Sequence, residues 1–437
     1  MIKHTFILVA ILVASAGAKA QQPAKASEFA IVDGDRVVFY GDSITEQRLY
    51  TTDIEIFVLT RFPDRKVSFF HSGVGGDRVS GGKDGPIDLR LHRDVFDHKP
   101  TVVTIMLGMN DGFYRAYDPD ILRSYKDGYR FIVDAIQKEF PQARLTLLKP
   151  SPYDDVTRPE TLAGGYNNVL ERFGVFCGDL AAEKHTGVAD LNAPVVDALE
   201  RAKTKNSALD VLLIPDRIHP GPALHWIMAE SLLKSWGAKP EVTFVHVDAG
   251  LKPTAQVSNT EVSELTKGGN HLRWTQVDKA LPLPIGPLDT DPLMALTLSS
   301  SDLISALDME TLRVTSLPPG SYSLRIDNRE VGAFSAEQLS AGINLALLET
   351  PMLEQSRHLG ADTEIRSTID RQIFDLNAKP EDQTSPDTIK QLAAAEEKAI
   401  ARQRADAQPV THHYELLPNG APNAAPHAPP NATKPSK

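Results

Sequence analysis

A serine, a histidine and an aspartate occur in this chain at spacings that suit acyl transfer. Asp216 and His219 lie three residues apart, and Ser43 follows the apolar run 37–40. A serine hydroxyl is a weak nucleophile at neutral pH, so it needs a base to accept its proton and a third group to orient that base. A carboxylate and an imidazole in one short loop can supply both. These residues predict a hydrolase with Ser43 as nucleophile, His219 as base and Asp216 as the orienting acid.

Two further segments offer hydrogen-bond donors. A glycine-rich stretch, residues 73–77, follows the strand-like run 66–70, and Asn110 follows the strand-like run 101–107. Acyl transfer passes through a tetrahedral oxyanion that fixed donors must stabilise. Glycine lets a backbone N–H approach the reacting carbon closely, and asparagine carries an amide donor. Both segments are therefore candidate parts of an oxyanion hole.

These four segments together resemble the SGNH/GDSL hydrolase family. Residues 41–45, 73–77, 108–111 and 216–219 match its motifs, in the family's order, and the resemblance spans residues 30–240. It implies an oxyanion hole made by the backbone N–H groups of Ser43 and Gly76 and the side-chain amide of Asn110. One departure is His71-Ser72, because many members carry asparagine before the glycine turn.

The elements that must position these residues alternate along the chain. Strand-like runs at 36–40, 66–70, 102–107, 145–149 and 187–191 are separated by helical patterns such as 121–139 and 166–184. This alternation predicts an α/β fold, a three-layer α/β/α sandwich with a parallel, flavodoxin-like sheet. Sites in such sheets form beyond the carboxyl ends of the strands, where three of the motifs fall.

The chain is long enough for more than one unit. Residues 1–20 read as a secretory signal peptide, which predicts export to the periplasm or beyond. We expect the hydrolase domain at 28–239, a small β-rich region at 240–358, a helical extension at 359–410 and a disordered tail at 411–437. Strands are expected at 312–316, 322–326 and 330–334, as one small antiparallel set.

Other residues beside the motifs are candidates for substrate contact. Arg78 and Arg217 lie next to motif residues, and Tyr153 and Asp154 follow the fourth strand at the same edge. The two arginines could equally pair with buried Asp42 or Asp77 instead of the substrate.

Each motif residue also has a purely structural alternative. Ser43 could be a helix N-cap, Gly76 a turn residue and Asn110 an Asx-turn residue, while Asp216 and His219 could merely hold a loop. The presence of all the motifs in one chain favours the catalytic interpretation.

Composition limits the partners. The net charge is −11 without basic clusters, which argues against nucleic acid as a ligand. Cys177, the single cysteine, lies in an apolar helical pattern and is expected in the core. The histidines lack metal-ligand spacing, so we expect neither a metal nor an organic cofactor. No run after residue 20 is long enough for a membrane span, and the oligomeric state stays open.

The predicted function is therefore a serine esterase. Exported relatives with comparable extensions are associated with polysaccharide deacetylation, so the resemblance implies hydrolysis of short-chain (acetyl) esters on a polysaccharide or oligosaccharide. The alternatives are a lysophospholipase, thioesterase or arylesterase of the same family, and a glycan-binding envelope protein with vestigial activity.

Overall fold

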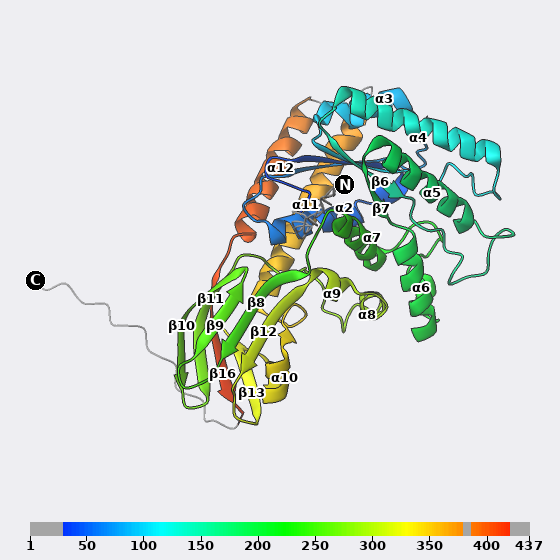
Figure 1. Ribbon diagram of the computed structural model, residues 1–437. Coiled ribbons are helices and arrows are strands. Elements are labelled where there is room, and N and C mark those ends of the chain that lie inside the picture. Colours follow the sequence, from blue (N-terminus) through cyan, green and yellow to red (C-terminus); the bar gives the residue numbers. More distant parts are fainter. Residues whose placement is uncertain (1–28, 379–385, 420–437) are drawn as a thin grey trace, which may run out of the picture.

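The computed structural model describes residues 29–378 and 386–419 and contains an α/β/α sandwich beside a β-rich region (Figure 1). The predicted signal peptide, residues 1–20, and residues 420–437 of the predicted tail lie outside the described residues. Within the described part of the chain, no helix combines the length and apolar character needed to cross a membrane.

Five parallel strands form the central sheet, in the order β2-β1-β5-β6-β7. They are β1 Arg36–Gly41, β2 Ser68–Gly73, β5 Val102–Met106, β6 Arg144–Lys149 and β7 Gly187–Asp190. Their apolar, β-branched residues are largely buried, as expected where helices cover both faces of a sheet. The predicted α/β class with a parallel sheet is confirmed.

Helices cover both faces of this sheet (Figure 1). One layer holds α3 Ile87–Asp94, α4 Pro119–Glu139 and α5 Asn167–Lys184, and the other holds α2 Leu49–Arg61, α6 Ala193–Lys205 and α7 Pro222–Ser235. The helix α4 illustrates why these segments form helices. The Asp118 carboxylate caps its first turn, and Pro119 is its first residue. Its buried residues Tyr125, Tyr129 and Ile132 recur at helical spacing.

The register of the sheet brings the motif segments to one edge. Gly41, the last residue of β1, pairs with Gly73 at the end of β2 and with Met106 at the end of β5. The loops that follow these three strands therefore begin side by side, as expected for sites at the carboxyl edge of a parallel sheet.

The C-terminal region contains two further sheets. One has the order β15-β12-β8-β9 and the other β10-β11-β16-β13-β14. The strands are β8 Glu241–Asp248, β9 Thr254–Ser258, β10 Thr260–Gly268, β11 His271–Asp278, β12 Met309–Thr315, β13 Ser321–Ile326, β14 Arg329–Ser335, β15 Ile343–Asn344 and β16 Thr411–Pro418. Val245, Trp274, Leu324 and Tyr414 belong to the second hydrophobic core, to which both sheets contribute.

Two predictions for this region are wrong in part. The strands at 312–316 and 322–326 do not form one set, because β12 pairs in parallel with β8 while β13 joins the other sheet. Residues 411–418 of the predicted disordered tail form β16, which lies between β11 and β13. Tyr414 and Leu416 alternate toward the core, and Tyr414 stacks on Trp274 at 5.0 Å.

Helices also interrupt and follow the β-rich region. Two long ones, α11 Pro351–Ala378 and α12 Pro386–Asp406, pack on each other, and α11 also contacts α2 and β2. The predicted helical extension at 359–410 thus begins earlier, at residue 351. The short elements are α1 Ser43–Glu46, β3 Gly81–Gly82, β4 Gly85–Pro86, η1 Phe96–His98, η2 Asp210–Leu212, α8 Pro292–Ser299, α9 Leu303–Leu307 and α10 Ala336–Ala341.

A buried ion pair joins the sandwich to the C-terminal region. Arg61, at the end of α2, lies 2.9 Å from the Asp308 carboxylate and donates to the backbone carbonyls of Leu281 and Leu307. Burial lowers the pKa of Arg61 and raises the pKa of Asp308 to about 6. Each charge is therefore costly alone, and the pair depends on both partners.

We predict that Arg61→Leu lowers the free energy of unfolding by about 3–5 kcal/mol, because it leaves a buried carboxylate without its counter-charge. Arg61→Leu/Asp308→Asn should recover part of that loss. Urea denaturation measures both. The control is Arg273→Leu, which breaks the more exposed Arg273–Glu415 pair and should cost less than about 1 kcal/mol. Equal losses in the single and double variants would contradict the prediction.

Candidate active site

The turn that carries Ser43 is closely packed. Asp42 caps α1 by accepting the backbone N–H of Ile44 at 3.1 Å, and Ser43 is the first residue of that helix. A Cβ atom on Gly41 would lie 2.2 Å from Oγ1 of Thr45, and one on Gly73 would lie 2.2 Å from the backbone nitrogen of Glu46. Only glycine fits at either position, so α1 rests directly on the ends of β1 and β2.

The loop 214–220 presents the acid and the base to this turn. The Asp216 carboxylate accepts the backbone N–H groups of Ile218 and His219 at 2.9 and 2.8 Å, and its other oxygen lies 2.6 Å from Nδ1 of His219. Nε2 of His219 lies 2.8 Å from Oγ of Ser43, a residue 176 positions away. Partial burial raises the pKa of Asp216, but the hydrogen bonds from His219 outweigh it and hold that pKa below its usual value.

This chain of contacts fixes the roles of the imidazole nitrogens. An ionised carboxylate only accepts hydrogen bonds, so Nδ1 carries the proton that Asp216 accepts. Nε2 is then free to accept the Ser43 hydroxyl proton. The structure therefore brings together Ser43, His219 and Asp216 in the order that nucleophilic catalysis requires.

The glycine-rich segment and the asparagine segment are joined directly. Gly76 has φ +81° and is exposed, and Nδ2 of Asn110 donates to the backbone carbonyl of the next residue, Asp77, at 3.0 Å. Asp77 is buried and pairs with Arg90 at 2.6 Å, which anchors this loop. Nδ2 has a second hydrogen, so Asn110 can donate to a ligand while it holds Asp77.

Tyr114 is a functional candidate that sequence reasoning missed. Its hydroxyl donates to Oδ1 of Asn110 at 3.0 Å, which sets the orientation of that amide. Burial, followed by the charges of Asp42 and Asp216, raises the pKa of Tyr114 to about 12. Phe113 and Tyr114 both have positive φ, 53° and 55°. Left-handed backbone at such residues clusters at functional sites.

The candidates for substrate contact divide into two groups. Arg78 packs its guanidinium over the ring of Phe113 at 4.6 Å and remains half-buried. Arg217 donates to the backbone carbonyls of Asp154 and Pro159. Neither arginine makes the ion pair with Asp42 or Asp77 that was the alternative, since Arg90 pairs with Asp77 and Asp155 lies nearest Arg217.

Tyr153 and Asp154 support the wall of the site from inside. Tyr153 is 9% exposed and meets Tyr166 edge to face at 5.4 Å. Asp154 is fully buried, and its carboxylate accepts hydrogen bonds from the backbones of Val156 and Thr157. Asp154, a candidate for substrate contact, is thus buried in this structure, and its oxygens hold the loop.

An apolar cleft of about 500 Å³ lies beside these loops. It is lined by Arg78, Asp111 and Phe113 and by Ile121 and Phe131 of α4. Among the described residues, no group of three His, Cys, Asp or Glu side chains has the arrangement of a metal site. Cys177 is buried, and its thiol lies 3.4 Å from the Tyr125 hydroxyl.

Asp42 is buried, and no basic side chain in the described part of the chain forms an ion pair with it. Burial raises its pKa from 3.8 to about 8, against the helix-capping hydrogen bond from Ile44, which lowers it. The folded state therefore binds the proton more tightly than the unfolded chain does. The stability that this proton contributes is lost as the pH rises through about 8.

We predict that Asp42→Asn flattens the pH dependence of stability between pH 4 and pH 8, because asparagine keeps the capping oxygen and has no proton to lose. The variant should gain stability relative to the wild type as the pH rises. Urea denaturation across this range measures the difference. Asp118→Asn, the same change at the exposed cap of α4, is the control. Parallel curves for Asp42→Asn and the wild type would refute the prediction.

Parts of this chain are similar to known proteins. Residues 39–227 match the model of the GDSL-like lipase/acylhydrolase family. A curated acetylxylan esterase of Geobacillus stearothermophilus is 23% identical over 226 residues, which cover 47% of this chain and 96% of that protein. A solved structure described as a gut microbial diltiazem-metabolizing enzyme superposes with a TM-score of 0.77 at 25% identity, over 90% of this chain and all of that one. Residues 39–227 therefore form a GDSL-like lipase/acylhydrolase domain, which is the SGNH/GDSL hydrolase family, and this domain supports a carboxylic ester hydrolase.

Proposed function

We propose that the protein is a serine esterase that removes acetyl groups from carbohydrate esters. The observation that carries the proposal is the continuous contact from Asp216 through His219 to Ser43, with distances of 2.6 and 2.8 Å. A pure binding protein has no need of an imidazole held against a serine, so this contact favours turnover over a glycan-binding role.

In the proposed mechanism Oγ of Ser43 attacks the ester carbonyl as Nε2 of His219 accepts its proton. Asp216 keeps the ring orientation and stabilises the imidazolium. The oxyanion is held by the backbone N–H groups of Ser43 and Gly76 and by Nδ2 of Asn110. The imidazolium returns the proton to the leaving alcohol. Water, with His219 again as base, then cleaves the acyl-enzyme and releases the acid.

The acetylated sugar class is supported by the relatives. The curated relative is an acetylxylan esterase, whereas the long structural match is described as metabolizing diltiazem. We propose acetylated xylan-like polysaccharides or oligosaccharides as the substrate class. Export through the predicted segment 1–20 would place the enzyme where such polymers occur.

A second candidate is hydrolysis of esters with longer or aromatic acyl groups, as in a lysophospholipase, thioesterase or arylesterase. The observation that favours it is the apolar cleft lined by Phe113, Ile121 and Phe131, together with Arg78 and Asp111. This cleft has the apolar lining that a long acyl chain requires.

We predict that the wild type hydrolyses p-nitrophenyl acetate faster than p-nitrophenyl decanoate, and that Ser43→Ala lowers kcat by at least about 10³-fold. Acetate release from acetylated xylan then tests the polymeric substrate. Preference for the decanoate would support the second candidate. If the wild type hydrolyses neither ester, the result would favour the glycan-binding protein.

Tyr114→Phe should lower kcat about tenfold with little change in KM, because the Asn110 amide loses the hydroxyl that orients it. Loss of a whole oxyanion donor, as in Asn110→Ala, typically costs about 10²–10³-fold. Since Tyr114 acts through Asn110, the double variant should be no slower than Asn110→Ala. Tyr117→Phe makes the same change on an exposed part of this loop and serves as control. Additive losses in the double variant would disprove the link.

A further inference from the structure

The helix α11 reaches the turn that carries Ser43, although the two are more than 300 positions apart in the chain. Figure 1 shows α11 and α12 side by side, next to α2 and the sheet. The family domain covers residues 39–227, so these helices come from outside it. Their contacts with the domain include several charged pairs.

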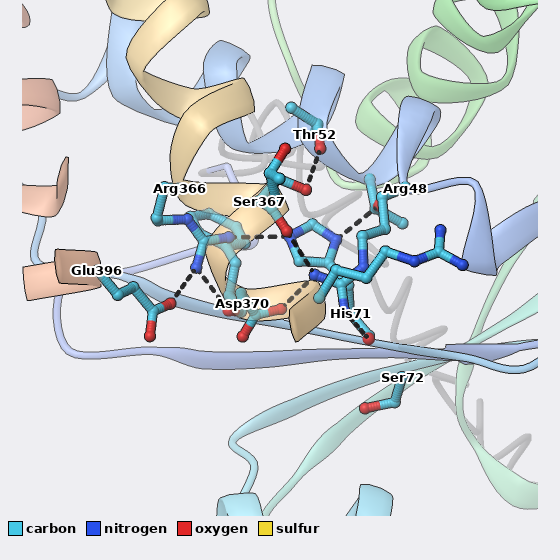
Figure 2. Close-up of polar contacts among 12 residues, drawn as sticks. Arg48, Thr52, His71, Ser72, Arg366, Ser367, Asp370 and Glu396 are labelled. Atoms are coloured by element: carbon cyan, nitrogen blue, oxygen red, sulfur yellow. Dashed lines mark hydrogen bonds and ion pairs between the residues drawn. The ribbon is translucent and has the colours of Figure 1, made fainter. Parts of the chain in front are cut away.

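The first contact is at Arg48, between α1 and α2 (Figure 2). Arg48 is 6% exposed and has φ 61°, a left-handed conformation that arginine rarely adopts. Its guanidinium donates to the backbone carbonyl of Ser367 at 2.9 Å and meets the Asp370 carboxylate at 2.5 Å. It also donates to the backbone carbonyl of His71, in β2, at 3.3 Å. Arg48 thus ties α11 to the turn after α1 and to β2, the strand that leads to the glycine-rich loop.

The second contact holds β2 itself. Arg366 is 3% exposed, contacts the Glu55 carboxylate at 2.7 Å and donates to Nε2 of His71 at 2.9 Å (Figure 2). Burial lowers the pKa of His71, so the ring is neutral; its Nδ1 lies 2.7 Å from the Thr51 hydroxyl. From α12, the Glu396 carboxylate lies 3.1 Å from Arg366. His71 is two residues before Gly73, so this cluster fixes the strand that leads to Gly76.

The third contact reaches the helix of the nucleophile. Arg371 donates to the backbone carbonyl of Glu46 at 3.0 Å, and its guanidinium lies 3.5 Å from the Glu46 carboxylate. Glu46 is the last residue of α1, which begins at Ser43. The same carboxylate extends over Gly75, where a Cβ atom would lie 2.7 Å from it, and lies 3.9 Å from Lys83.

We infer that α11 belongs to the catalytic unit, and that Arg371 and Asp370 are positioning residues that hold the Ser43 turn against the glycine-rich loop. The inference rests on the proposed function and extends it to a part of the chain that the family domain lacks. Arg371 acts on Ser43 through Glu46, and Asp370 acts through Arg48. Small displacements of a nucleophile are costly, because attack requires the reacting atoms in near-contact geometry.

Arg371 is the better test residue because its side chain is 44% exposed and its loss leaves no buried charge. Arg371→Ala should lower kcat for p-nitrophenyl acetate about tenfold, with KM and the thermal unfolding midpoint nearly unchanged. The rate at which a fluorophosphonate modifies Ser43 should fall by the same factor. Arg371→Lys should restore most of both rates, since lysine can still donate to the Glu46 carbonyl.

Two further variants complete the experiment. Asp370→Asn should lower the same rates and also the unfolding midpoint, because Arg48 then stays buried without its counter-charge. Arg402→Ala is the matched control: it breaks the Arg402–Asp362 pair between α12 and α11 and should leave both rates unchanged.

Three results would overturn the inference. The first is that both rates are unchanged in Arg371→Ala. The second is that Arg371→Ala raises KM and retains kcat, which would make Arg371 a substrate contact. The third is that Arg402→Ala lowers both rates as much as Arg371→Ala does. The wild type separates this inference from the proposed function. Absence of ester turnover there contradicts the esterase, while the ratio of fluorophosphonate rates still tests whether α11 positions Ser43.

Discussion

The absence of space for a side chain at Gly41 and Gly73 is the constraint on which the site depends. At both positions a Cβ atom would lie 2.2 Å from an atom of α1, so the helix of Ser43 lies flat on the ends of two neighbouring strands. The sheet register then determines where the glycine-rich and asparagine loops begin relative to Ser43. His219 comes from a loop far along the chain, and its contact with Ser43 is possible only because this turn is fixed.

Burial assigns different electrostatic properties to the carboxyl groups around this turn. Asp42 stands next to Ser43, and with a pKa of about 8 it is mostly protonated at pH 7. It therefore adds little repulsion to an oxyanion forming nearby. Asp77 is buried too, but Arg90 compensates its charge. Asp216 has a lowered pKa and contacts the far side of the imidazole. Negative charge is thus placed where it stabilises an imidazolium and is reduced where an oxyanion would form.

Local patterns predicted the fold class, the five strands and the residues that meet at the site, because their geometry is encoded within a few residues. Asp216 and His219 share one loop, and each glycine motif directly follows its strand. Contacts that depend on an unusual backbone conformation or on distant segments were not predictable in this way. Tyr114 reaches Asn110 only through two successive left-handed residues, which no residue type signals. Asp154 follows the strand β6 at the edge where the site lies, but its side chain is buried. The strand β16 pairs with β11 and β13, two strands that lie far earlier in the chain.

The helix α11 connects the hydrophobic core of the C-terminal region to that of the sandwich. Met352, near its start, packs in the core of the β-rich region, whereas Leu359 packs in the core of the sandwich. The next turns carry the charged residues that meet α1 and β2. Buried ion pairs contribute little net stability compared with apolar packing, but a mispaired charge is heavily penalised. Pairs such as Arg48–Asp370 and Arg366–Glu55 therefore select one register of α11 on the domain. After α12 the chain returns to the β-rich sheet as β16, so both ends of the helical hairpin are anchored in the same region. Because α11 is anchored in this way, it can hold Arg48 in its left-handed conformation beside the turn of Ser43. Without the contacts from α11, the backbone at Arg48 would return to a more favourable conformation.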